Sequence, residues 1–330
     1  MIIKNFEPFC GKHCETTATG TLLKQLDINL SEPLLFGLGE GLGFIFWNMK
    51  NMERPFLGGR IKPDLLTKNI CKNLNLDLEV FETSSKKLAW ENVSKYLNNQ
   101  KLVGLKLDCY HLDYFSNKIH FAAHYGSIYG YDDNYAYLID TEQQGSKVKT
   151  ALKSLELARA EKGSMSSNNL SYIINKKIPN TFELNKIIKK AIYNNCLDYL
   201  NPPIKNIGYK GIFKASQEIK KWFEKTNNIK EDFQITSMLM EKAGTGGSLF
   251  RNFYRDFLKE SSILLNSKDL NKAYIEFIEI SKLWKEISDL FYEAGESSDK
   301  NIINKISDIL KELSEKEYNT MSYLKKITEE

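Results

Sequence analysis

The sequence predicts an α+β domain followed by an all-helical bundle, and three observations support this fold class. Short runs of alternating apolar and polar residues, which are typical of strands, occur through the first half of the chain. From about Pro179 the apolar residues recur at helical spacing up to the C-terminus. The 330 residues correspond to two domains at roughly 150 residues each. We expect these domains to be residues 1–180 and 181–330.

The first domain is expected to combine a helix with several strands. A short loop runs into a helical segment after Cys14. The strand-like runs are rich in β-branched and aromatic residues, and two of them form a hairpin that turns at Asp132-Asp133-Asn134. The expected strands are Asp77–Phe81, Leu102–Leu107, Ser171–Ile174 and the two arms of the hairpin Tyr125–Ile139.

The second domain is expected to contain amphipathic helices. Three stretches carry apolar residues at helical spacing, namely Leu184–Ile192, Leu249–Leu258 and Leu270–Phe291. The glycine-rich segment Gly244–Gly247 is expected to turn the chain into the second stretch. Gly295 and Ser297-Ser298 are expected to end the third, which is the longest.

Composition and charge argue against several classes of protein. Hydrophobic residues make up 42% and charged residues 27% of the chain, as in folded rather than disordered proteins. The net charge is only +4, and the lysines are dispersed, which argues against a nucleic-acid partner. The longest apolar run, around Leu42–Trp47, is too short to span a membrane, and the N-terminus lacks a signal-peptide pattern. We therefore expect a cytoplasmic protein whose five cysteines are thiols.

Cys14 is the candidate nucleophile. It lies where the loop Gly11-Lys-His enters the expected helix. The partial positive charge and free N–H groups of a helix N-terminus favour a thiolate, and a backbone N–H at the same turn can donate to an oxyanion. A free cysteine taken alone is more often a small buried hydrophobic residue. Cys14 is therefore a catalytic candidate only if a base accompanies it.

His124 and Asp140 are the candidate base and the carboxylate that orients it. His124 opens the first arm of the expected hairpin and Asp140 ends the second arm, so strand pairing brings the two together. The carboxylate then orients the imidazole, and the imidazole activates the thiolate. Only four histidines are present. The combination favours a Cys14, His124 and Asp140 triad over an incidental cysteine.

Two alternatives to this triad remain open. His120 falls on the same face of the strand as His124, so it is a competing base. Cys10 and Cys14, with His120 and His124, have i, i+4 spacings and form an alternative Cys₂His₂ zinc set. The cysteine spacing is looser than usual, and no Glu follows His120 as in a metalloprotease helix. We therefore predict that no metal is bound.

Two further segments have sequence features that could serve a function. The run Gly37–Gly43 does not match the dinucleotide fingerprint, and no Gly-Lys-Ser/Thr follows it for a phosphate loop. We expect its glycines to allow close backbone approach beside the catalytic helix, with Glu40 structural or facing a substrate. Arg251 and Arg255 are expected to be surface charges or to dock an acidic partner.

Longer strings carry a family resemblance. In the first half they resemble the N-terminal domain of the butirosin biosynthesis protein H family, and in the second half the helical domain usually fused to it. The resemblance therefore spans nearly the whole chain. The strings are His13–Gly20, Leu30–Phe44, His124 with Gly130–Asp133 and Asp140, Gly208–Ile212 with Trp222, and Glu241–Phe257.

The resemblance implies a papain-like cysteine peptidase fold for the first domain, and acyl transfer rather than proteolysis. The founding member of the family resembles an acyltransferase that forms an amide from an aminoacyl group on a carrier-protein thioester. The chain is most similar to the amide-forming, protease-like branch of closthioamide biosynthesis, which builds a peptide on peptidyl carrier proteins. On this basis Cys14 accepts the acyl chain from a phosphopantetheine thiol. His124 deprotonates Cys14 and then the amine, and Asp140 holds His124.

The implied partners are acyl or peptidyl carrier proteins and an amine acceptor such as an amino acid, a diamine or an aminoglycoside-like molecule. No cofactor is expected on the enzyme itself, because the substrates are carried on phosphopantetheine. We expect the helical domain to cover the cleft and to dock the carrier protein, whose acidic surface would suit a mildly basic chain.

Glu40, His13 and Tyr114 are assigned to substrate binding. The glutamine that papain-like enzymes place before their cysteine has no counterpart between Asn5 and Cys14. We therefore expect Lys12, His13 or a neighbouring backbone amide to supply the oxyanion donor beside the Cys14 N–H.

The same triad also suits a cysteine hydrolase. A thioester leaves as a thiolate, so the outcome depends on whether an amine or water reaches the acyl-enzyme first, and exclusion of water favours the amide. A peptidase or thioesterase is therefore the alternative function. A binding protein without activity would be expected to lack one member of the triad, and all three candidates are present.

Overall fold

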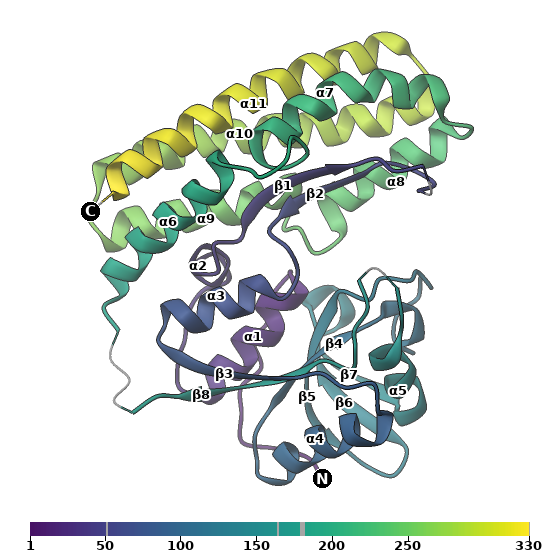
Figure 1. Ribbon diagram of the computed structural model, residues 1–330, viewed down its shortest axis with the longest axis vertical. Coiled ribbons are helices and arrows are strands. Elements are labelled where there is room, and N and C mark those ends of the chain that lie inside the picture. Colours follow the sequence, from purple (N-terminus) through teal and green to yellow (C-terminus); the bar gives the residue numbers. More distant parts are fainter. Residues whose placement is uncertain (51, 164, 179–181, 330) are drawn as a thin grey trace. The chain divides into compact units, whose positions relative to one another are not determined.

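The computed structural model describes residues 1–50, 52–163, 165–178 and 182–329. The chain forms two compact units (Figure 1). The first unit consists of Met1–Leu35 and Pro63–Phe182, and the second of Phe36–Lys62 and Glu183–Glu330. The predicted boundary at residue 180 lies outside the described residues.

An antiparallel sheet of six strands organises the first unit (Figure 1). The strand order is β3-β8-β4-β5-β6-β7. Every residue of β4 is buried, because helices α1, α4 and α5 all pack against it. The strands are β3 (Leu76–Phe81), β4 (Val103–Leu107), β5 (His124–Tyr131), β6 (Tyr135–Ile139), β7 (Lys147–Ala151) and β8 (Ser171–Lys176).

The helices of this unit are short, and α1 (Cys14–Gln25) is buried from Glu15 to Leu23. Its buried threonines bond to backbone carbonyls and to other segments, and Thr19 Oγ1 lies 2.7 Å from Oγ1 of Thr67, which belongs to a separate helix. Since almost no part of α1 meets water, its sequence has no polar face. The other elements are α3 (Leu65–Asn73), α4 (Lys86–Asn98), α5 (Leu152–Ala160) and the 3₁₀ turns η1 (Cys109–His111) and η2 (Glu142–Gln144).

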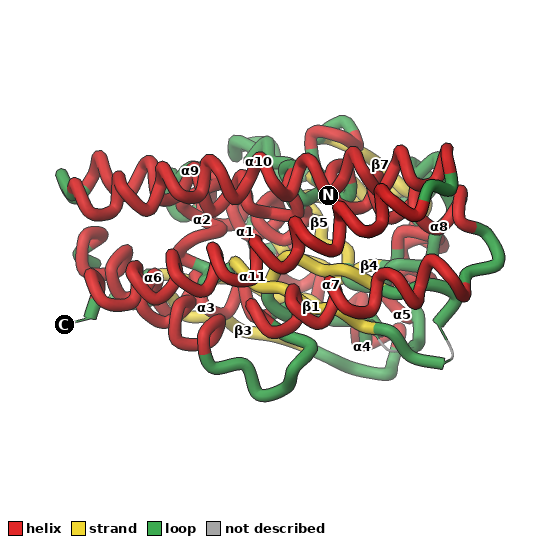
Figure 2. The backbone as a smooth tube through the Cα atoms, turned by 90° about the horizontal axis from the view of Figure 1, so that it is seen from above, coloured by secondary structure: helices red, strands yellow, loops and turns green. Residues whose placement is uncertain are grey.

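Long helices dominate the second unit. Helices α10 and α11 pack side by side over most of their length (Figure 2). Their inward faces bury Phe277, Trp284, Phe291 and Leu310 completely. The helices are α6 (Leu184–Leu200), α7 (Gly208–Lys225), α8 (Ile229–Lys242), α9 (Arg251–Leu264), α10 (Lys268–Ser297) and α11 (Lys300–Thr328), with a 3₁₀ turn η3 (Ser248–Phe250). Helix α2 (Glu32–Leu38) spans the sequence junction between the two units.

The second unit also contains a two-stranded ribbon, formed by β1 (Leu42–Trp47) and β2 (Phe56–Arg60). Alternate residues of β1 are buried, and the Phe44 ring lies 5.5 Å from the Trp284 ring. Phe46 N donates to Asn206 O at 2.9 Å. The elements of the described residues after β8 are all helical, as predicted, and the ribbon that joins them in the second unit comes from the first half of the sequence. The ribbon finds its apolar partners more than 150 residues away in the sequence, which a local pattern does not reveal.

The glycines of Gly37–Gly43 allow close approach within the second unit. A Cβ on Gly37 would lie 2.2 Å from the Phe257 ring, and one on Gly43 would lie 2.8 Å from the Arg60 backbone. The close neighbours of these two glycines therefore belong to the second unit.

Most of the predicted elements are confirmed. Helix α1 begins at Cys14, and strands β3, β4 and β8 and the hairpin β5–β6 lie at the predicted positions. Helix α9 begins at Arg251 rather than Leu249, because Leu249 and Phe250 have positive φ angles of 48° and 72°. Helix α10 continues through Gly295 and ends before Ser298, which is left-handed with φ 54°. In the described part of the chain, every helix is too short or too polar to cross a membrane.

Candidate active site

Cys14 is the first residue of helix α1 and is partly exposed. The turn before it is fixed by the His13 carbonyl oxygen, which accepts hydrogen bonds from Thr16 Oγ1 at 2.9 Å and Thr17 Oγ1 at 2.7 Å. Thr17 N donates to the same oxygen at 2.9 Å, which closes the first helical turn. The Cys14 side chain therefore lies at the helix N-terminus, where the helix dipole favours a negative charge.

The Glu32 carboxylate holds the loop that leads into Cys14. It accepts hydrogen bonds from the backbone N–H groups of Lys12 and His13 at 2.9–3.0 Å and from Thr16 Oγ1 at 2.7 Å. Burial raises the pKa of Glu32, although these hydrogen bonds act in the opposite direction. A Cβ on Gly11 would lie 2.8 Å from the Glu32 carboxylate, so glycine is needed at this close approach.

The hydrogen bonds to Glu32 restrict which groups can donate to an oxyanion at Cys14. The backbone amides of Lys12 and His13 already donate to Glu32, which leaves the side chains of these residues or another backbone amide as the donor expected beside Cys14. The Cys14 N–H, the first helical amide, remains a candidate donor.

His124 and Asp140 form a buried hydrogen-bonded pair. His124 Nε2 lies 2.7 Å from Asp140 Oδ2, and the Asp140 side chain is fully buried. Tyr114 Oη donates to the same carboxylate oxygen at 2.7 Å, and Thr141 N donates to Oδ1 at 2.6 Å. Burial acts to raise the pKa of Asp140, but His124 and these donors outweigh it, and the pKa is lowered. The carboxylate is therefore charged and fully bonded.

The pair results from strand geometry. His124 is the first residue of β5, where it pairs with Leu107 of β4, and Asp140 directly follows β6. Since β5 and β6 are antiparallel neighbours, the start of one lies beside the end of the other. Phe115 packs edge-on against the His124 ring at 5.1 Å.

A second cysteine, Cys109, lies beside His124. Burial acts to lower the pKa of His124, but the Asp140 charge and then Cys109, through its charge and a hydrogen bond, raise it well above the ordinary value. Cys109 is the first residue of η1 and is only 7% exposed. The Cys109 side chain thus lies close enough to the imidazole to act on its charge.

The link between Cys14 and this cluster is Tyr114, whose pKa is affected by both. Burial is the main cause that raises the pKa of Tyr114, followed by Asp140, and the charges of Cys109 and Cys14 act in the same direction. The backbone joins the same segments, because Glu142 N, two residues after Asp140, donates to Gly11 O at 2.8 Å. The first unit thus brings Cys14, Cys109, Tyr114, His124 and Asp140 into one neighbourhood.

The three residues assigned to substrate binding lie in different surroundings. Tyr114 contacts Asp140 directly. His13 is buried, with Nδ1 3.5 Å from Thr16 Oγ1. Glu40 belongs to the second unit, where it is 7% exposed and accepts a hydrogen bond from Asn194 Nδ2 at 2.9 Å.

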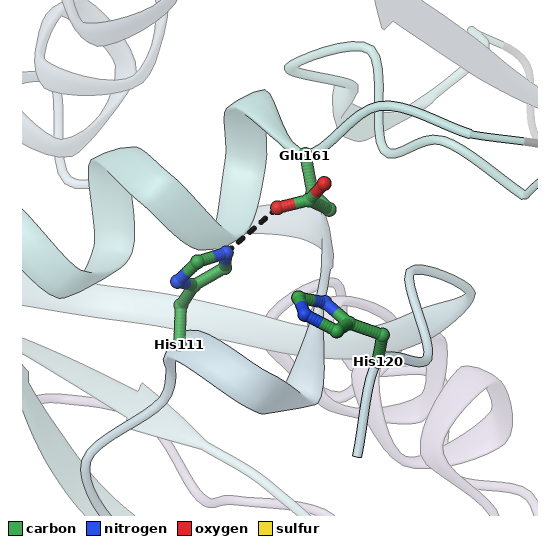
Figure 3. A group of neighbouring side chains, drawn as sticks. All are labelled: His111, His120 and Glu161. Atoms are coloured by element: carbon green, nitrogen blue, oxygen red, sulfur yellow. Dashed lines mark hydrogen bonds and ion pairs between the residues drawn. The ribbon is translucent and has the colours of Figure 1, made fainter. Parts of the chain in front are cut away.

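The residues of the alternative zinc set lie in separate surroundings. His124 is paired with Asp140, and Cys10 is exposed and accepts a bond from Ser146 Oγ at 3.7 Å. His120, the competing base, lies instead with His111 and Glu161 (Figure 3). Its Nδ1 is 3.4 Å from Asp108 Oδ2.

Arg251 is not a surface charge, and the prediction that it docks a partner is wrong. Its side chain is fully buried in the second unit and forms two hydrogen bonds of 2.9 Å to the Glu317 carboxylate. Trp284 Nε1 donates to the same carboxylate at 2.6 Å. Arg255 is partly exposed and pairs with the neighbouring Asp256 at 2.8 Å.

Two family models match the chain. One, described as butirosin biosynthesis protein H, N-terminal, matches residues 13–141. The other, described as a domain of unknown function (DUF4872), matches residues 153–324, just over half of the chain. The chain belongs to the DUF4872 family and has a BtrH-like N-terminal part. The DUF4872 match begins in helix α5, so it includes the last strand of the first unit as well as most of the second.

The other comparisons add little detail. No curated protein matches the chain. Among solved structures, the chain is similar to the peptidase domain of Streptococcus ComA, described as a bi-functional ABC transporter involved in a quorum sensing pathway. The identity is 11% and the TM-score 0.34, and the match covers 52% of this chain and 98% of that one.

Two residues of this BtrH-like part were not predicted from the sequence. Cys109 lies two residues after the end of β4, and the register that places β4 beside β5 is what carries it to His124. Glu32 lies in the segment before Pro33, and only the fold brings its carboxylate to the loop before Cys14. The signal for Cys109 is its position two residues beyond a buried strand, next to the strand that begins with His124.

Proposed function

We propose that this chain is a cysteine-dependent acyltransferase that forms an amide bond from an acyl thioester carried by a carrier protein. The observation that supports this most is the buried 2.7 Å hydrogen bond between His124 and Asp140 in the same neighbourhood as Cys14 at a helix N-terminus. A base oriented by a carboxylate, next to a thiol at a helix N-terminus, is the arrangement required for nucleophilic catalysis by cysteine. The BtrH-like family match supports a biosynthetic enzyme.

The reaction proceeds in two steps. His124 takes the proton of Cys14, and the thiolate attacks the thioester carbonyl; the carbon–sulfur bond to the carrier breaks, and the carrier leaves as a thiolate that takes this proton from His124, so that the imidazole is neutral again. An amine then attacks the acyl-Cys14 carbonyl, His124 takes up its proton, and the amide leaves as Cys14 is released. The raised pKa of His124 suits this role, because the imidazole accepts a proton readily.

The structure contains two cysteines for which this role must be considered. We assign the nucleophile to Cys14, because it is partly exposed and lies at the start of a helix of twelve residues. Cys109 is buried beside the ring of His124, where it acts on the charge of the imidazole.

The acyl donor is proposed to be a phosphopantetheine-bound acyl or peptidyl group, and the acceptor an amine, which includes a carrier-bound amino acid. Assembly of a peptide as in closthioamide biosynthesis is one specific form of this proposal. The carrier contact does not include Arg251, because that side chain is buried against Glu317.

Product analysis distinguishes the acyltransferase from a hydrolase. The chain is incubated with an acyl-loaded carrier protein, with and without an amine or an aminoacyl-loaded carrier, and the products are identified by mass spectrometry. The proposal expects the amide when the amine is present, and loss of all products in Cys14→Ala. Release of free acid at the same rate with or without the amine would instead establish a cysteine thioesterase.

A further inference from the structure

Two histidines and a glutamate form a cluster in the first unit, separate from the His124–Asp140 pair. His111, His120 and Glu161 each offer one ligand atom, and these atoms all lie within 4.8 Å of one another (Figure 3). His111 Nε2 lies 2.7 Å from Glu161 Oε2. His120 is exposed, whereas His111 and Glu161 are partly exposed, so solvent and ions have access to the cluster.

The backbone holds the three residues near one another. His111 ends turn η1, and Glu161 directly follows helix α5. Asp108 N donates to Ala158 O at 2.9 Å, which links η1 to α5, and Cys109 N donates to Phe121 O at 3.2 Å, which links η1 to the segment that carries His120. The cluster is therefore built on hydrogen-bonded segments rather than on a free loop.

The ring of His120 has a defined orientation. It stacks on the Tyr110 ring at 4.0 Å with an interplanar angle of 12°. Its Nδ1 lies 3.4 Å from Asp108 Oδ2, and this carboxylate is buried. When a metal binds Nε2, the Nδ1–H is left to donate to Asp108. Metal-binding histidines usually donate their other ring N–H to a carboxylate in this way, which fixes the orientation of the ring.

We propose that His111, His120 and Glu161 bind a divalent transition metal ion, with Zn²⁺ as the preferred ion. Two imidazoles and one carboxylate are ligands that Zn²⁺ accepts, and a water molecule completes a tetrahedral site. Zinc–ligand distances of about 2.1 Å require ligand atoms roughly 3.4 Å apart. The cluster reaches this spacing if the His111 and Glu161 atoms separate slightly and His120 moves inward.

The metal would order the segment that lies over the candidate active site. His111 and His120 flank residues 112–119, which include Tyr114 and Phe115. Tyr114 donates to Asp140, and Phe115 packs against the ring of His124. A single zinc ion bound to both ends of this segment therefore positions Tyr114 and Phe115 without touching the substrate.

Zinc titration of the metal-free full-length chain tests this site. The measurement uses the Cys14→Ala chain, so that the candidate nucleophile does not compete for the metal, and a chromophoric chelator as the competitor. The variants His120→Ala and Glu161→Gln are made in that background. Glu156→Gln, which changes a glutamate of helix α5 that pairs with Lys86, is the matched control. Circular dichroism establishes that each variant is folded.

The proposal expects one bound Zn²⁺ per chain. Removal of a residue that only bonds to a metal ligand costs roughly 10- to 100-fold in affinity, so loss of a direct ligand should weaken zinc binding by more than this. Glu156→Gln should bind zinc within about twofold of its parent. Zinc should raise the melting temperature of the parent but not that of His120→Ala. With Co²⁺, the absorption spectrum should lack thiolate-to-metal charge transfer.

Three results would overturn the site. The first is that the parent binds zinc no more tightly than a double variant in which His111→Ala and His120→Ala are combined. The cluster would then be a hydrogen-bonded ion pair and not a metal site. The second is equal affinity in the parent and Glu161→Gln. The third is a thiolate charge-transfer band, which would place the metal on a cysteine such as Cys109.

Discussion

His124 is the residue on which the proposed chemistry depends most. Its ring bonds to a buried carboxylate, and Cys109 lies close enough to act on its charge. Because Asp140 also accepts bonds from Tyr114 and Thr141, its position is fixed by several elements of the fold. The tautomer and orientation of the imidazole therefore follow from the burial of Asp140.

Replacing Asp140 by Asn should lower kcat by about 10²- to 10⁴-fold, because the imidazole loses the charge that stabilises its protonated form. Steady-state turnover of an acyl-loaded carrier measures this effect. Asp133→Asn, at the exposed hairpin turn, is the control and should leave kcat unchanged. Full activity in Asp140→Asn would exclude the pair from catalysis.

The His124 pair should also make stability depend on pH. The pKa of His124 is raised in the folded chain, so its contribution is fully present below about pH 6.5 and is lost as the pH rises through the folded value. The pKa of Asp140 is lowered, so its contribution is present above about pH 3.9 and is lost as the pH falls through the folded value.

Urea unfolding at a series of pH values measures this contribution. The difference in free energy of unfolding between the unmodified chain and His124→Gln should shrink as the pH rises above 6.5. A difference that grows over the same range would mean that His124 is neutral in the folded chain.

The sequence alone could predict the His124–Asp140 pair, because both residues lie at the ends of two neighbouring hairpin strands. It could not predict Cys109 or Glu32, whose partners are brought to them by strand register and by the packing of separate segments. For the same reason Arg251 looked exposed, since its partner Glu317 lies 66 residues further along the chain.

At the scale of elements, helix α1 depends on the loop before it. The Glu32 carboxylate occupies the amides of Lys12 and His13 and bonds Thr16 in the first turn. It therefore fixes the direction in which the chain enters the helix at Cys14. This contact joins two segments that a local sequence pattern treats separately.

Glu32→Ala should lower the free energy of unfolding by about 2 kcal/mol, because buried hydrogen bonds to a carboxylate are lost. It should also slow alkylation of Cys14 by iodoacetamide, since the thiol is no longer held at the helix N-terminus. Urea unfolding and peptide mapping measure the two effects. Glu7→Ala, which removes an exposed glutamate, is the matched control and should change neither. Unchanged stability in Glu32→Ala would show that water replaces the carboxylate without loss.

The elements that the sequence predicted best have a local cause. Strands β4, β5, β6 and β8 and helix α10 follow directly from spacing and turn residues. The ribbon β1–β2 and the start of α9 do not, because their conformations are set by distant partners. Phe250, for example, keeps a positive φ while its ring stacks on Phe36 at 5.8 Å.

At the scale of the whole molecule, the second unit is built around a buried ion pair. Arg251 and Glu317 are both fully buried, and Arg251 also donates to Gly59 O at 3.2 Å. The pair therefore joins α9 and α11 to the ribbon β1–β2. Burial acts to lower the pKa of Arg251, but Glu317 outweighs it and the pKa is raised.

Arg251→Ala should lower the free energy of unfolding by about 3–5 kcal/mol, because Glu317 remains buried without its partner. Thermal unfolding of the full chain measures the change. Arg255→Ala, which breaks a partly exposed pair on the same helix, should cost no more than about 1 kcal/mol. Equal melting temperatures for the two variants would contradict the structural role of Arg251.

The most direct test of the proposed acyltransferase is the location of the acyl group on the chain. The unmodified chain, Cys14→Ala and Cys109→Ala are incubated with an acyl-loaded carrier protein and analysed by intact mass and peptide mapping. We predict an adduct on Cys14 in the unmodified chain and in Cys109→Ala, which disappears as amide forms when amine is added, and no adduct in Cys14→Ala. An adduct on Cys109, or no adduct on any of the three chains, would contradict the assignment of Cys14 as the nucleophile.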